Sequence, residues 1–176
     1  MRLEGQRVAV FVEEGFEDLE FWVTVMRLKE EGARVTIVGP DAGKDYRAKH
    51  ALSASSDVSA DEVTVDDFDA VVVPGGWAPD KLRRYESVTG LVRKAHDQNK
   101  IVGLICHAGL VGISAGIVNG MRATGSKGIK DDLINAGATW VDEPAFTEGN
   151  VVWGRVVDDI PDFCRELVTA MERSTR

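Results

Sequence analysis

Short apolar runs rich in β-branched residues recur along the chain and alternate with segments of helical spacing. The runs lie at residues 7–12, 34–39, 69–76 and 101–105. A continuous apolar run of this length is typical of a strand that is buried on both faces of a sheet. The alternation therefore predicts an α/β fold, a three-layer α/β/α sandwich with a mainly parallel central sheet.

The segments between these runs have the apolar periodicity of helices. We expect helices over residues 17–32, 78–100, 106–116, 126–137 and 158–173, the second of them split into a short turn and a full helix. In the first helix, apolar residues stand at positions 19, 22, 23, 26 and 28, and Gly32 is a natural stop. Residues 40–67 are polar and irregular, with short extended pieces at most, and residues 139–155 contain short strands around a turn. No repeat divides the chain, so we expect a single domain over residues 1–176.

Composition limits the partners and the compartment that we expect. The chain has 176 residues, 44% of them hydrophobic, and a formal net charge of −8. Such a chain can form one core, and it lacks the Lys and Arg clusters of nucleic-acid binders. The apolar stretch near the amino terminus, residues 8–12, is too short for a signal peptide or a transmembrane helix. We therefore expect a cytoplasmic protein with no nucleic-acid partner and no membrane.

The cysteines and histidines give no metal signature. Two cysteines, Cys106 and Cys164, in a cytosolic chain are expected to be free thiols. The histidines His50, His96 and His107 are far apart, and there is no Cys-x-x-Cys pair. We expect neither a metal nor another cofactor.

The carboxyl ends of parallel strands meet at one edge of the sheet, where ligands bind in such folds. Three strand ends therefore matter: residues 13–18, residues 74–77, and the pair Cys106-His107. Cys106 stands between a strand and an expected helix, where free helical N–H groups favour the thiolate. This resembles the turn around a hydrolase nucleophile, although a core cysteine is an equally good reading of this stretch alone.

The neighbouring strand ends supply groups that a nucleophile needs. Glu17 can share a hydrogen bond with the thiol or relay a proton, although a contact with the helix dipole explains it as well. The backbone amides of Gly76 and His107 can form an oxyanion site beside the sulfur. The His107 ring is a candidate catalytic base for the thiol, although a histidine that caps a helix start is the simpler interpretation. Because the two residues are adjacent, we expect the ring to diverge from the thiol. Trp77 lies at the mouth of the expected pocket.

The chain also resembles a known family over nearly its whole length. The resemblance rests on these segments: "GFEDLEFW", "RLKEEGARV", "FDAVVVPGGWAPDKLR", "ICH", "GIKDDLINAGATWVD" and "DDIPDFCREL". They are similar to the PfpI-type intracellular cysteine protease family. That family belongs to the flavodoxin-like, class I glutamine amidotransferase-like superfamily, which includes the parkinsonism-linked protein deglycase. The resemblance implies a flavodoxin-like sandwich for this chain.

The resemblance also implies roles for particular residues. Cys106 would be the nucleophile, Glu17 the carboxyl hydrogen-bonded to its sulfur, and the Gly76 and His107 amides the oxyanion site. In the protease branch an acid from a neighbouring subunit pairs with the histidine, and the matching position here is Asp80. A homodimer, or a larger homo-oligomer, is therefore expected.

Two classes of function follow from this resemblance. The first is a stress-protective cysteine-dependent hydrolase, with a peptidase, glyoxalase or protein deglycase activity. Its substrate would be a peptide, a small carbonyl compound such as methylglyoxal, or a glycated protein. The second is a non-catalytic redox sensor or chaperone-like stress protein that uses oxidation of Cys106.

Overall fold

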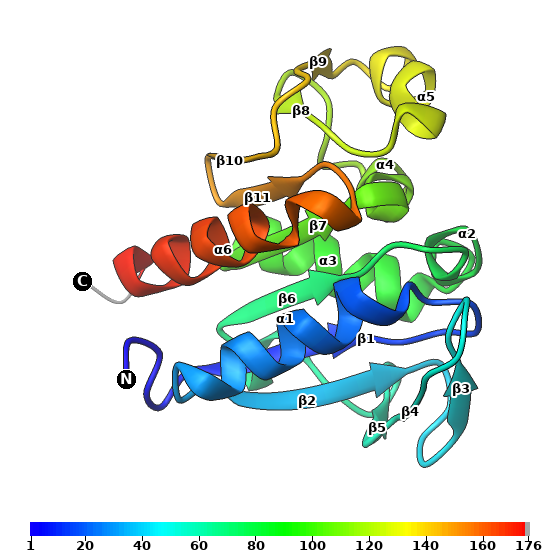
Figure 1. Cartoon of the computed structure of the whole chain (residues 1–176), viewed down its shortest axis with the longest axis vertical. Helices are drawn as coiled ribbons and strands as arrows, with labels where there is room; N and C mark the ends of the chain where they lie inside the picture. Colours follow the sequence, from blue (N-terminus) through cyan, green and yellow to red (C-terminus); the bar gives the residue numbers. More distant parts are fainter. Residues whose placement is uncertain (175–176) are drawn as a thin grey trace.

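The computed structural model describes residues 1–174 and contains a seven-stranded sheet with helices on both faces (Figure 1). In spatial order the strands are β10 (Ala145–Glu148), β11 (Val151–Gly154), β7 (Ile101–Ile105), β6 (Ala70–Val73), β1 (Arg7–Phe11), β2 (Arg34–Gly39) and β5 (Val58–Ser59). All neighbouring pairs are parallel except the hairpin of β10 and β11. The predicted α/β fold with a mainly parallel sheet is confirmed.

Helices cover the two faces of this sheet. On one face lie α1 (Asp18–Glu30) and α6 (Ile160–Ser174), and on the other α3 (Glu86–Asp97) and α4 (Gly109–Ala115). The shorter helices are α2 (Ala78–Leu82) and α5 (Lys130–Asn135), and 3₁₀ turns span Val65–Asp67, Cys106–Ala108, Lys127–Ile129 and Val157–Asp159. A parallel pair, β8 (Arg122–Ala123) and β9 (Thr139–Trp140), lies beside α5. Within residues 1–174, no helix has the length and apolar character needed to cross a membrane.

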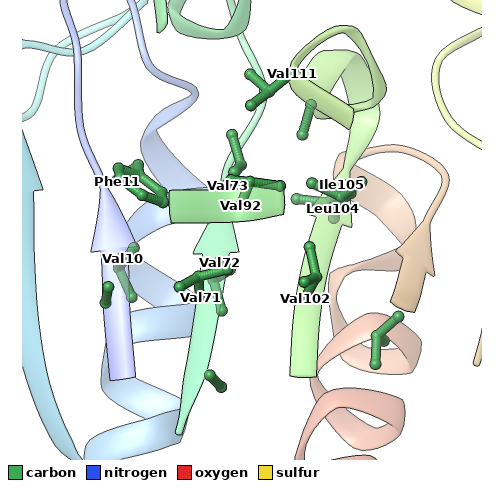
Figure 2. Packing of buried hydrophobic residues seen from close by; sticks show 14 of the residues in the cluster. Val10, Phe11, Val71, Val72, Val73, Val92, Val102, Leu104, Ile105 and Val111 are labelled. Carbon is green, nitrogen blue, oxygen red and sulfur yellow. The ribbon is translucent and has the colours of Figure 1, made fainter. Parts of the chain in front are cut away.

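The central strands are rigid because both of their faces are buried. Figure 2 shows side chains of β1, β6 and β7 packing against Val92 of α3 and Val111 of α4. Each fully buried aliphatic side chain of this kind contributes about 1.5–3 kcal/mol to stability. These strands therefore form a fixed platform for the residues at their carboxyl ends.

The buried face of α1 differs from the apolar stripe in its sequence. Phe21, Thr24, Val25 and Leu28 face the core together with Glu20, which is 0% exposed. Of the predicted stripe, Leu28 is buried and Trp22 is partly buried, whereas positions 19, 23 and 26 are exposed to solvent. The helix is turned in this way because the sheet and α6 contact the side that holds residues 20, 21, 24, 25 and 28. A glutamate thus occupies a core position.

A small hairpin forms in the segment that the sequence predicts to be irregular. Its strands are β3 (Asp45–Arg47) and β4 (Ser53–Ser55), which within residues 1–174 pair only with each other. The Asp18 carboxylate accepts the backbone N–H groups of residues 50–52 at 2.8–3.0 Å. In addition, the Lys49 N–H donates to the Phe16 carbonyl at 2.8 Å. These bonds fix the hairpin tip beside the start of α1.

Candidate active site

Cys106 lies in a strained turn at the end of β7. Its φ is 62°, in the left-handed region that costs a non-glycine residue about 1–2 kcal/mol. A 3₁₀ turn over Cys106–Ala108 follows, and α4 begins only at Gly109. The prediction of a helix starting at Cys106 is therefore wrong by three residues. Of the helix N-terminal amides that we expected to activate the thiol, that of His107 in the 3₁₀ turn interacts with the sulfur, and other groups around the sulfur add to it.

Two backbone amides supply part of that environment. The N–H groups of Gly76 and His107 interact with the Cys106 sulfur and oppose the rise in its pKa. Gly76 has a φ of 80°, and a Cβ there would lie 2.5 Å from Glu17 N and from Gly15 O. Only glycine fits this position, because a side chain would collide with this backbone. The close approach places the Gly76 amide beside the sulfur.

Glu20 is the carboxyl group that contacts the thiol. It interacts with Cys106 through its charge and through a side-chain hydrogen bond. Its Oε2 also accepts the Gly75 N–H at 2.7 Å, and its Oε1 is buried with no other partner in the described part of the chain. Gly75 lies between the two side chains, where a Cβ would collide with both. The missing side chain of Gly75 therefore allows the carboxyl group and the thiol to meet.

Burial governs the protonation of this pair. Desolvation, and then the negative charge of Glu20, raise the pKa of the Cys106 thiol to about 12. Desolvation likewise raises the pKa of the Glu20 carboxyl from 4.5 to about 7. The pair therefore loses its first proton near neutral pH, and it keeps the second proton up to a much higher pH. A thiolate can form here when the retained proton lies on the carboxyl group.

The predicted hydrogen bond between Glu17 and the sulfur is wrong. Glu17 is the N-cap of α1, and its Oε2 accepts the N–H groups of Leu19 and Glu20, both at 2.8 Å. Its Oε1 lies 4.0 Å from Nε2 of His50. A carboxylate at a helix start is held by the free amides of the first turn. Glu17 lines the same cavity as Cys106, but Glu20 contacts the thiol.

The His107 ring lies closer to the thiol than sequence adjacency suggests. Its Nδ1 is 3.3 Å from the Cys106 sulfur, because the left-handed turn at Cys106 brings the two side chains together. Burial, and then the charge of Lys49, lower the pKa of His107, so the ring is neutral at neutral pH. Within residues 1–174, Nε2 has no hydrogen-bond partner. Both the ring and the amide of His107 therefore face the sulfur.

Asp80 and Trp77 occupy the outer part of this region. Asp80 lies on α2, is exposed, and forms an ion pair with Arg84. It does not line the cavity of Cys106. Trp77 does line it, and its side chain is 60% exposed at the mouth. The ammonium group of Lys49 lies 5.5 Å from the centre of the Trp77 ring.

The cavity has a volume of about 320 Å³. Its wall consists of Glu17, Glu20, Lys49, Gly76, Trp77, Cys106, His107, Ser126, Val156, Val157 and Asp158. A second hollow of about 400 Å³ adjoins it and shares Ser126, Val156 and Asp158. The sequence reasoning missed Glu20, Lys49, Ser126 and Asp158 as site residues. Glu20 has the spacing of the buried Thr24 and Leu28, but this signal can be used only once the inward face of α1 is known.

One group near the cavity has metal-binding residue types. Ligand atoms of Glu17, Asp18 and His50 all lie within 4.8 Å of one another. However, both Asp18 oxygens and one Glu17 oxygen already accept backbone N–H groups. These carboxylates hold the hairpin and the start of α1 in place, and we assign no metal to them.

The sequence is similar to a known protein family and to individual proteins in it. The sequence model of the DJ-1/PfpI family matches residues 6–170. A Pyrococcus furiosus protein named deglycase PfpI is 40% identical over 157 residues, which cover 89% of this chain and 94% of that protein. The putative cysteine protease YraA of Bacillus subtilis is 34% identical over 168 residues, 96% of this chain and 99% of that protein.

A solved structure shows the same fold. It is a two-domain protein of Anabaena variabilis with a DJ-1/ThiJ/PfpI-like domain and a ferritin-like domain. The two structures align with a TM-score of 0.91 and 35% identity over 93% of this chain. The aligned part is 47% of that protein, so this chain spans about half of its length.

Proposed function

This chain belongs to the DJ-1/PfpI family, and we propose that it is a cysteine-dependent hydrolase that attacks carbonyl groups through Cys106. The substrates that we propose are early glycation adducts on proteins and small oxoaldehydes such as methylglyoxal. One observation carries the proposal. Cys106 stands in a strained turn within a cavity, with Glu20 and two backbone amides around its sulfur. The names of the relatives, deglycase and putative cysteine protease, agree with such an activity.

The first step is addition of the thiolate to the carbonyl carbon. A C–S bond forms, and the electron pair of the C=O bond moves to oxygen. We assign the amides of Gly76 and His107, which interact with the sulfur, as the donors to this oxygen. Glu20, whose pKa is about 7, supplies the proton that converts the alkoxide into a hydroxyl group.

The second stage releases the product and restores the thiol. For methylglyoxal, the proton on the carbon bonded to sulfur moves to the neighbouring carbonyl carbon, and the hydroxyl proton moves to the oxygen of that carbonyl group, which gives a thioester. Water then hydrolyses this thioester to lactate and frees Cys106. We assign the proton transfers to Glu20 and to the neutral His107 ring, because these two groups flank the sulfur.

A second copy of the chain completes this proposal. The Nε2 atom of His107 has no partner within residues 1–174, and Asp80 is exposed on α2. We propose that Asp80 of a neighbouring subunit pairs with His107 in a homodimer or larger assembly. This pairing would orient the imidazole ring for proton transfer.

The test compares wild type, Cys106→Ser and Cys164→Ser on three substrates. These are methylglyoxal, with lactate measured, a peptide freshly glycated with methylglyoxal, with the released amine measured, and casein. Lactate formation and amine release that require Cys106 but not Cys164 would support the proposal. Cleavage of casein alone would show a peptidase instead.

The redox-sensor hypothesis gives a different result in the same assays. It requires ready oxidation of Cys106 by peroxide and no turnover of any of the three substrates. Cys164 offers no resolving thiol, since it is buried on α6 and contacts Oγ1 of Thr24 at 3.8 Å. Peroxide would therefore give a sulfenic or sulfinic acid at Cys106 and no internal disulfide.

A further inference from the structure

Lys49 brings a positive charge to the cavity that no carboxylate neutralises. The chain has 29 Asp and Glu residues but only 21 Lys and Arg, so most cations could find a partner. Within residues 1–174, however, the Lys49 ammonium forms no ion pair, and it lies over the ring of Trp77 instead. Both residues line the cavity of Cys106. The charge thus stays available to a ligand.

The backbone of Lys49 is held in place relative to the reacting groups. Its N–H donates to the Phe16 carbonyl, and the next three residues donate to Asp18. Phe16 in turn forms bridges with Ala48 on one side and Gly76 on the other. Lys49 is therefore tied, through one residue, to the glycine whose amide interacts with the sulfur.

The charge of Lys49 also acts on the groups beside the sulfur. It opposes the rise in the pKa of Glu20 and adds to the fall in the pKa of His107, and both groups flank Cys106. Three carboxyl groups line the cavity, but their surroundings differ. Glu20 has a pKa of about 7, the helix amides hold one oxygen of Glu17, and Asp158 belongs to the segment before α6. The hairpin side of the cavity is thus its cationic side.

We propose that Lys49 determines substrate specificity by binding an anionic group, a carboxylate, close to the carbonyl carbon that Cys106 attacks. The chemical class is a carbonyl compound that carries a carboxylate near its reacting carbon, such as a short oxo acid or the carboxyl-terminal residue of a glycated peptide. This inference rests on the proposed function, because it takes Cys106 as the attacking group. An ammonium–carboxylate pair at the mouth aligns the substrate and leaves the amides of Gly76 and His107 for the carbonyl oxygen.

Two alkylating reagents that differ in charge test the inference. Iodoacetate and iodoacetamide are similar in size and react alike: sulfur forms a bond to carbon, iodide leaves, and the thiol proton passes to solvent. The ratio of their rates at Cys106, located by mass spectrometry, reports how the cavity treats a carboxylate. Any change in the Cys106 pKa affects both rates and cancels in this ratio.

Lys49→Gln should lower the iodoacetate-to-iodoacetamide ratio roughly two- to five-fold, as expected for a partly exposed charge pair. Lys49→Arg should keep the ratio near that of wild type. The matched control is Lys44→Gln, which removes a charge from the same hairpin. Lys44 pairs with Asp41 at 2.9 Å and does not line the cavity, so its loss should leave the ratio unchanged.

The outcomes separate this inference from the proposed function. If Cys106 reacts with both reagents and the ratio is the same in wild type and Lys49→Gln, the inference is overturned while the nucleophile stands. An equal fall of the ratio in Lys44→Gln would also overturn the inference, because the loss of any nearby positive charge would then have the same effect. If neither reagent modifies Cys106, the proposed function fails and the inference fails with it.

Discussion

The carboxyl group of Glu20 and the thiol of Cys106 form a buried pair that joins the first turn of α1 to the end of β7. Both groups resist ionisation because the protein surrounds them. The Glu20 carboxyl raises the pKa of the thiol further, whereas the hydrogen bond from the thiol lowers the pKa of Glu20 in part. The pair therefore behaves as a unit that gives up one proton near neutral pH. This relationship leads to predictions about reactivity and about stability.

The reactivity of Cys106 should follow the shared proton. In wild type, the rate of alkylation by iodoacetamide should rise with pH through an inflection near 7, where the pair loses its first proton. In Glu20→Gln the thiol titrates alone in a buried site, so the inflection should move above pH 8.5, the pKa of an ordinary free thiol, by roughly one pH unit or more. Rates measured from pH 5 to 10 would show the difference. An inflection that stays near 7 in Glu20→Gln would exclude proton sharing.

Glu20 should also make the stability of the protein depend on pH. Its pKa is raised in the folded state from 4.5 to about 7, so the folded protein holds a proton that the unfolded chain releases. The stabilisation is complete below pH 4.5 and is lost as the pH rises through 7. Between these limits, the free energy of unfolding of wild type should fall relative to that of Glu20→Gln by about 3 kcal/mol. Urea unfolding of both proteins at several pH values checks this, and a constant difference would contradict it.

Glu17 should matter for the helix and not for the thiol. Glu17→Ala removes the side chain that accepts two N–H groups at the start of α1, which should lower the free energy of unfolding by about 1 kcal/mol. The alkylation inflection of Cys106 near pH 7 should remain, because Glu20 is still present. A variant with normal stability and an altered inflection would restore Glu17 as the partner of the thiol.

Gly76 should be intolerant of any side chain. In Gly76→Ala the new Cβ meets backbone atoms of Glu17 and Gly15, which cannot rotate away, and we expect a loss of about 3 kcal/mol in stability. The matched control is Gly43→Ala, where φ is also positive, at 63°, but nothing lies within 4 Å. It should lose only about 1 kcal/mol. Thermal unfolding compares the two, and equal losses would show that crowding at Gly76 is relieved by movement.

Asp80 should affect activity through another subunit. Asp80→Asn removes an exposed ion pair with Arg84, so the stability of the chain should change by less than about 1 kcal/mol. If Asp80 pairs with His107 of a second copy, turnover of methylglyoxal should fall by roughly ten-fold or more, in line with the usual contribution of an oriented acid–base group. Light scattering gives the oligomeric state. A monomeric and fully active enzyme would exclude the intersubunit pair.

The sheet could be read from the sequence because its strands are long, apolar and buried on both faces. The hairpin of β3 and β4 could not be predicted in this way, because strands of three residues are too short to show an apolar periodicity. Its position depends on the Asp18 carboxylate and the Phe16 carbonyl, which the chain brings close only after folding. Lys49 was missed for the same reason.

The residues of the candidate site could also be predicted only in part. Cys106 was identified because it follows a buried strand, and chain position is enough for that. The sequence did not identify which of Glu17 and Glu20 contacts the thiol. Successive helical residues are about 100° apart, so the residue at which the helix begins decides which side chain points inward. The helix-dipole contact, which the sequence offered as the alternative for Glu17, is the one that forms: the Glu17 carboxylate bonds to first-turn amides instead of the thiol.

The hairpin that carries Lys49 pairs with no strand of the main sheet. The residues that would select a substrate and those that react with it therefore lie on separable parts of the chain. Residues 45–55 form a cassette that could be exchanged between relatives without altering β7 or the turn at Cys106. Such an exchange should change which substrate is bound and, through the charge at position 49, the pKa values of Glu20 and His107.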